Sequence, residues 1–191
     1  MSRWLLTYKG FDPAEEGLRE ALCTVGNGYF ATRGAAPEAA AGDVHYPGTY
    51  FAGLYNRLGT EMSGRVIENE DLVNAPNWLP LQFRMAGDDT WFSIESASVE
   101  DYELELDLLR GVLMRSFVWI DEQDRRTLVN QRRFVSMRDP HVAGLVTTFR
   151  AENWSGTLEV RSALDGTVIN AGVPRYRSLE SRHLEPIETR P

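Results

Sequence analysis

Apolar and polar positions alternate with a period of two along most of the chain after residue 78. Such alternation is typical of β-strands that bury one face. The predicted strands, separated by turns rich in Gly, Asp and Asn, cover residues 79–85, 91–94, 112–120, 127–137, 142–151 and 158–164. No strand–helix–strand rhythm and no internal repeat accompanies them. The pattern therefore predicts an antiparallel all-β sandwich.

One helix is signalled near the N-terminus. Asp12 is suited to the N-cap position, a proline follows it, and Glu15 lies three residues after the cap. The expected helix covers Pro13–Leu22, with Leu18 and Leu22 on one face. The fold class predicted is thus all-β with one short N-terminal helix.

Three runs in the first 80 residues combine turn-forming residues with large aromatic rings. They are Val25–Gly34 (VGNGYFATRG), Pro47–Asn56 (PGTYFAGLYN) and Leu72–Leu79 (LVNAPNWL). These segments must turn tightly and also bury rings, which is typical of a packed loop system at a site or an interface. A Trp78 ring face with nearby Asn amides suits a sugar, whereas the simpler interpretation is that Trp78 and Tyr50 fill space between loop and sheet.

Composition indicates one domain over residues 1–191, with 42% hydrophobic and 25% charged residues. The net charge of −8 argues against nucleic-acid binding. The single cysteine, Cys23, excludes an internal disulfide and favours a cytoplasmic protein, with Cys23 as a small core residue. The N-terminal apolar stretch, residues 4–6, is too short for a signal peptide or a membrane span, so no membrane partner is expected.

Candidate chemistry is sparse. The acidic run over residues 95–107 fits a solvated edge that protects a strand better than a catalytic carboxylate pair. His45, His141 and His183 lie far apart, so neither a metal site nor a cofactor is expected. No nucleophile or phosphate-binding motif occurs, and no catalytic residue is proposed. His45, which lies between the first two aromatic runs, and Trp78 are the candidate substrate-binding residues.

The three aromatic runs resemble the N-terminal domain of glycoside hydrolase family 65, which includes maltose, trehalose and kojibiose phosphorylases. Further pieces follow in the family's order: Leu106–Arg115 (LDLLRGVLMR), Arg132–Val142 (RRFVSMRDPHV) and Ser162–Asn170 (SALDGTVIN). The resemblance covers about residues 4–177. Ala31, where the family usually has Gly, and the alanine-rich stretch after Gly34 depart from the pattern and leave the subfamily open.

The resemblance implies a β-supersandwich of the galactose mutarotase-like class, followed in the family by an (α/α)6 barrel that carries the catalytic glutamate. In the phosphorylases of the family, inorganic phosphate is the co-substrate; in the hydrolases, water takes that role. We therefore expect a truncated piece of a larger enzyme, without activity of its own, whose partners are the catalytic barrel and a disaccharide. An exposed docking face could also allow a homodimer.

Two other classes of function remain open. A free-standing carbohydrate-binding module would use the region of Trp78 and Tyr50. A mutarotase-like epimerase would need a histidine and a glutamate that converge on a sugar ring, and neither His45 nor His141 has an obvious partner in the sequence.

Overall fold

The protein is described by a computed structural model that covers residues 4–171 and 178–188. Its elements in chain order are β1 (Leu5–Lys9), α1 (Glu16–Leu22), β2 (Val25–Gly26), β3 (Phe30–Thr32), β4 (Thr49–Phe51), β5 (Tyr55–Met62), β6 (Arg65–Leu72), β7 (Leu81–Met85), β8 (Ser98–Asp107), β9 (Val112–Ile120), β10 (Arg126–Val135), β11 (Ala143–Ala151) and β12 (Leu158–Ser162). All strand pairs in the described residues are antiparallel, and α1 is the one helix there, which confirms the predicted fold class.

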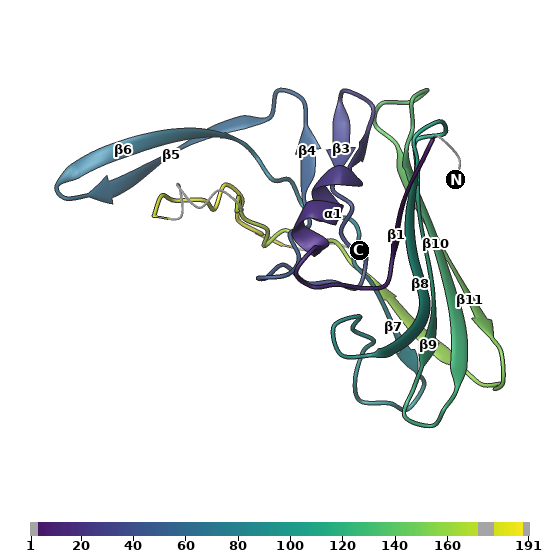
Figure 1. The fold of residues 1–191 in the computed structure, drawn as a ribbon. Helices are drawn as coiled ribbons and strands as arrows, with labels where there is room; N and C mark the ends of the chain where they lie inside the picture. Colours follow the sequence, from purple (N-terminus) through teal and green to yellow (C-terminus); the bar gives the residue numbers. More distant parts are fainter. Residues whose placement is uncertain (1–3, 172–177, 189–191) are drawn as a thin grey trace.

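A five-stranded sheet in the order β1-β8-β9-β10-β11 forms the largest layer. The pair β12-β7, the small sheet β2-β3-β4 and α1 lie beside it, as Figure 1 shows. Phe83 of β7 reaches across to Trp119 of β9 and Phe149 of β11, with ring centroids 5.6 and 4.8 Å apart. The core therefore lies between the large sheet and the β12-β7 pair. On the large sheet, alternate residues of β9 and β10 are buried, and they contribute most of its side of the core.

The helix is shorter than predicted. Asp12 does act as a cap, but of a turn: its carboxylate accepts a hydrogen bond from Ala14 N at 3.1 Å. The helix itself begins at Glu16, and no side chain caps it. Leu18 and Leu22 share the exposed face, at 56% and 50% exposure, so the predicted apolar face is not the one that packs inward.

The acidic run is not an edge. Its residues from Ser98 to Asp107 form β8, which pairs with β1 on one side and with β9 on the other, while Glu95 lies in the turn before it. A bulge between Glu100 and Glu103, with Asp101 at φ 51°, shifts the alternation of inward and outward side chains by one residue, so that Tyr102 is buried and Glu103 lies on the outer face. The predicted edge strand is therefore an interior strand with an acidic outer face.

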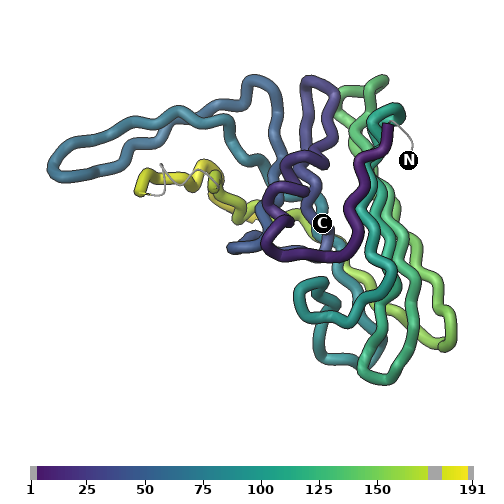
Figure 2. Tube along the Cα trace, in the orientation of Figure 1, coloured from purple at the N-terminus to yellow at the C-terminus, as the bar shows by residue number. Residues whose placement is uncertain are grey.

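Two further differences concern the strands. Residues 91–94 form no strand, although Phe92 N donates to Phe83 O at 2.8 Å. The hairpin β5–β6 was not predicted, and it turns at Ser63 and Gly64, whose φ angles of 51° and 74° fit a tight two-residue turn. Figure 2 shows that the hairpin extends away from the body of the molecule. Residues 178–188, the C-terminal segment, run beside it.

None of the helical structure in residues 4–171 and 178–188 is long and apolar enough to cross a membrane.

Candidate functional site

The three aromatic runs meet in one cluster. Phe30 of β3 pairs with Phe51 of β4, with ring centroids 5.2 Å apart, and the ring of Trp78 lies 6.2 Å from that of Phe30. Trp78 is half-buried and packs against the hydrophobic core. The predicted packed loop system is therefore present, and it places Trp78 at its boundary with solvent.

The asparagine side chains of the third run form hydrogen bonds with backbone groups of the loops. Asn74 accepts a hydrogen bond from Thr49 N at 3.0 Å and donates to Pro47 O at 3.2 Å and Ile169 O at 3.1 Å. Asn77 accepts from Leu79 N at 3.1 Å. Both ends of the Asn74 amide and the oxygen of Asn77 are therefore used to bind backbone groups of the loops.

His45 is enclosed, with 1% exposure. Its Nδ1 lies 2.7 Å from Glu20 Oε1, and the other oxygen of that carboxylate accepts from Tyr46 N at 2.9 Å. The ring stacks on Phe11 with centroids 6.1 Å apart, and Nε2 lies 3.8 Å from Glu95 Oε1, beyond hydrogen-bond distance. Glu20 and Glu95 are thus the carboxylate partners that the sequence did not reveal for His45.

Burial lowers the pKa of His45, but the hydrogen bond and charge of Glu20 outweigh it, so the pKa is raised. When His45 is protonated, it forms a buried ion pair with Glu20 that joins the segment before Tyr46 to helix α1. Phe11 and Glu95 also line an open surface hollow of about 740 Å³. The hollow therefore lies next to His45, but the imidazole ring of His45 is buried and does not line it.

This pair predicts a pH dependence of stability. Because the folded pKa of His45 exceeds its unfolded value of 6.5, the pair stabilises fully below that pH and less as pH rises through the folded pKa. The melting temperature should therefore fall as the pH rises above about 6.5, and it should fall less in His45→Gln. Melting curves across this range test it. The exposed His141→Gln serves as control and should keep the wild-type slope; an unchanged slope in His45→Gln would contradict the assignment.

A second buried ion pair joins the alanine-rich stretch to the large sheet. Arg115 donates to Glu38 through Nη1 at 2.9 Å and Nη2 at 2.5 Å, and Nη1 also donates to Gln131 Oε1 at 3.0 Å. Burial alone would lower the pKa of Arg115, but the charge of Glu38 raises it above its usual value. Arg133 binds the same stretch by donating to Arg33 O at 3.1 Å and Ala35 O at 2.9 Å.

Cys23 has 0% exposure, and burial raises the pKa of its thiol to about 11. Such a thiol is not a nucleophile at neutral pH, which agrees with the core role predicted for it. Within residues 4–171 and 178–188, no group of three His, Cys, Asp or Glu side chains is placed to hold a metal ion.

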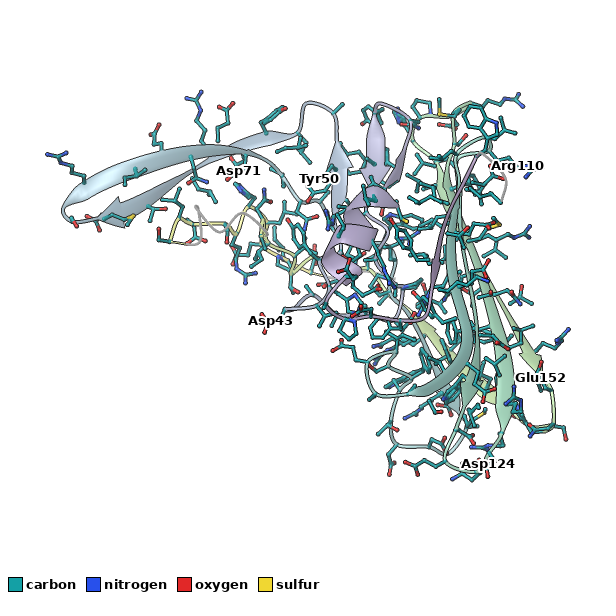
Figure 3. The ribbon with its side chains drawn as sticks, viewed as in Figure 1. Asp43, Tyr50, Asp71, Arg110, Asp124 and Glu152 are labelled. Carbon is teal, nitrogen blue, oxygen red and sulfur yellow. The ribbon has the colours of Figure 1, made fainter. Side chains whose placement is uncertain are left out.

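The hairpin β5–β6, which we call the arm, exposes large apolar side chains. Tyr55 is 59% exposed, Val66 66% and Ile67 43%. Figure 3 shows Asp71 on this arm and Tyr50 near its root. The C-terminal segment contacts the arm through Glu180 N, which donates to Thr60 Oγ1 at 2.7 Å. Asn69 Nδ2 also donates to Glu180 O at 3.4 Å, so hydrogen bonds join this segment to the arm, while Tyr55, Val66 and Ile67 stay exposed.

The chain matches the family model described as glycosyl hydrolase family 65, N-terminal domain, over residues 6–190. A solved structure from the human microbiome, assigned provisionally as a kojibiose phosphorylase, superposes with a TM-score of 0.77 at 23% identity. That match covers 86% of this chain and 22% of the other, and it shows the shared fold. The antiparallel sandwich with its packed aromatic loops is thus of the family 65 N-terminal type, and the chain belongs to that family.

Sequence comparison with curated proteins agrees with this family assignment. The chain is 48% identical over 185 residues to a Mycobacterium tuberculosis protein described as an uncharacterized glycosyl hydrolase, covering 97% of this chain and 14% of the relative. It is 34% identical to the trehalose 6-phosphate phosphorylase of Lactococcus lactis, covering 95% of this chain and 23% of that enzyme. The chain therefore spans less than a quarter of the length of these relatives.

Proposed function

We propose that this chain is the non-catalytic N-terminal domain of a cytoplasmic family 65 enzyme that acts on an α-linked glucose disaccharide. Its role is to support the catalytic barrel and shape its entrance. The names of its relatives support the substrate class, since they include phosphorylases of trehalose 6-phosphate and kojibiose. Inorganic phosphate is the co-substrate of the whole enzyme if it is a phosphorylase.

The observation that carries this proposal is the exposure of large apolar side chains on separate elements. They are on the arm, at Tyr55 and Val66, and on the outer face of α1, at Leu18 and Leu22. Large exposed apolar side chains gathered on an element mark surfaces that meet other protein. The charged groups at the loops are meanwhile paired internally, as Glu20 is with His45 and Glu38 with Arg115. The buried ion pairs of the loops thus stabilise this domain itself, whereas the exposed apolar side chains are available to contact the catalytic barrel.

A direct sugar contact by Trp78 or His45 stays part of the proposal. Trp78 is supported by its half-buried ring, part of which a sugar face can stack on. For His45, a contact requires the Glu95 side chain, 49% exposed, to move from its place near Nε2.

The second candidate, a free-standing carbohydrate-binding module, is favoured by the partial exposure of Trp78 and Tyr50. Calorimetric titration with maltose, trehalose, kojibiose and trehalose 6-phosphate separates the two. For the isolated chain we expect no binding at about millimolar sugar, because the Asn74 amide is occupied by backbone groups and the rings are only partly open. Binding at that concentration which Trp78→Ala removes, with the fold retained, would favour the module instead.

A further inference from the structure

The strand β12 has one side that pairs with β7 and one side that is open. Next to the ladder, Ala163 N donates to Pro80 O at 3.0 Å. Because hydrogen-bonded and non-hydrogen-bonded pairs alternate in an antiparallel ladder, the backbone N–H and C=O groups of Leu158, Val160 and Ser162 point away from β7. Within residues 4–171 and 178–188, no strand pairs with β12 on that side. These backbone groups therefore form a free edge.

The face of β12 that looks toward the core is incompletely covered at this edge. Val160 lies directly opposite Phe83, and directly opposite residues share one face of a sheet. Phe83 is fully buried, whereas Val160 is 50% exposed. Leu164, which follows the strand, is exposed as well. A strip of apolar surface therefore lies along the free backbone groups.

The two edge strands of the large sheet are less suited to pairing with a copy of themselves. β1 ends in Lys9, whose exposed charge discourages the approach of another strand. Arg150 is the one charged residue within β11, so two copies of β11 would bring no opposite charges together. β12 contains neither lysine nor proline, and its ladder with β7 has no bulge. This edge therefore lacks the usual protection against association.

The sequence of β12, LEVRS, is complementary to itself in an antiparallel pair. When two copies pair about a two-fold axis at Val160, Glu159 of one protomer lies opposite Arg161 of its partner, and the same pair occurs again across the axis. These are non-hydrogen-bonded positions, where side chains are closest and opposite charges stabilise. We propose that β12 pairs with β12 of a second copy of this chain, which joins the two small sheets into one across a symmetric dimer.

Contacts within one protomer leave room for these ion pairs. Arg84 Nε donates to Glu159 Oε2 at 2.7 Å, and Arg161 donates to Gln82 Oε1 through Nε and Nη2. Among the described residues, Glu159 Oε1 and Arg161 Nη1 have no hydrogen-bond partner. Each charged side chain therefore keeps one polar atom for the partner protomer.

Sedimentation equilibrium of the purified chain tests the proposal. We expect a reversible monomer–dimer equilibrium at about 0.1–1 mM chain, because two five-residue strands form less than a standard interface. Arg161→Glu and Glu159→Arg each place like charges opposite one another, so each should raise the dissociation constant about 10-fold or more. An equimolar mixture of the two variants restores both opposite-charge pairs and should form a heterodimer about as tightly as wild type. Circular dichroism checks that each variant is folded.

Two further variants separate this edge from other surfaces. Lys9→Glu makes the same change of charge on β1 and should leave the dissociation constant unchanged. Val160→Pro removes the N–H that points away from β7, so it should abolish the dimer while the β12-β7 hydrogen bonds remain. A wild-type chain that stays monomeric up to about 1 mM would overturn the proposal. Dimers that persist in Val160→Pro, or folded charge variants that do not associate when mixed, would also contradict it.

Discussion

Replacement of Glu38 by alanine lowers the free energy of unfolding by about 3–5 kcal/mol, the largest effect we expect from one side chain. The side chain of Glu38 is 0% exposed and that of Arg115 is 5% exposed, so the variant leaves a guanidinium buried without its counter-charge. The loss of stability comes mainly from burying the Arg115 charge without a partner, and it is larger than the net contribution of the intact ion pair to stability. Urea denaturation followed by tryptophan fluorescence measures the loss.

The matched control is Glu70→Ala. Glu70 pairs with Arg57 on the arm, where both side chains are largely exposed, at 49% and 71%. Solvent screens such a pair, so its loss should leave the denaturation midpoint almost unchanged. Equal losses in the two variants would show that the Glu38 pair is not buried in solution.

Replacement of Phe83 by alanine should cost about 3–5 kcal/mol. Phe83 is 0% exposed and stacks on Phe92 with ring centroids 4.5 Å apart. It also contacts rings on β9 and β11, so its removal opens a cavity where β7 packs on the large sheet. Denaturation of the variant by urea, with an unchanged slope, measures the loss.

Phe134→Ala is the control for this second experiment. Phe134 is 40% exposed and lies on the outer face of the same sheet, opposite Gly144 in the neighbouring strand. We expect a loss of about 1 kcal/mol or less. If Phe83→Ala costs no more than Phe134→Ala, the core does not lie between β7 and the large sheet.

The parts of the fold that follow local rules could be read from the sequence. The predicted strand over residues 112–120 coincides with β9, because its apolar run is bounded by turn residues on both sides. The strands over 142–151 and 158–164 were placed within two residues for the same reason. The family resemblance rested on the aromatic runs, whose rings do pack together.

Other parts depend on contacts that local patterns do not contain. The arm β5–β6 is solvated on both faces for most of its length, so it carries no strong period-two apolar signal. The bulge at Asp101 shifts the alternation within β8, which made an interior strand resemble an acidic edge.

The candidate site shows the same limit. Glu20 and His45 are 25 residues apart, and Glu38 and Arg115 are 77 apart, so no spacing rule indicates that either pair exists. The sequence did single out His45 and Trp78. The pairing that buries His45, and the use of the asparagines to hold the loops, required the folded arrangement.

We propose above that this domain supports catalysis without performing it. The most direct test is incubation of the purified chain with maltose, trehalose, kojibiose and trehalose 6-phosphate, with and without inorganic phosphate. The phosphorylase of Lactococcus lactis serves as positive control on trehalose 6-phosphate. We expect no release of glucose or of a glucose phosphate above the enzyme-free blank. Release from any of these sugars that scales with the concentration of the chain would contradict it.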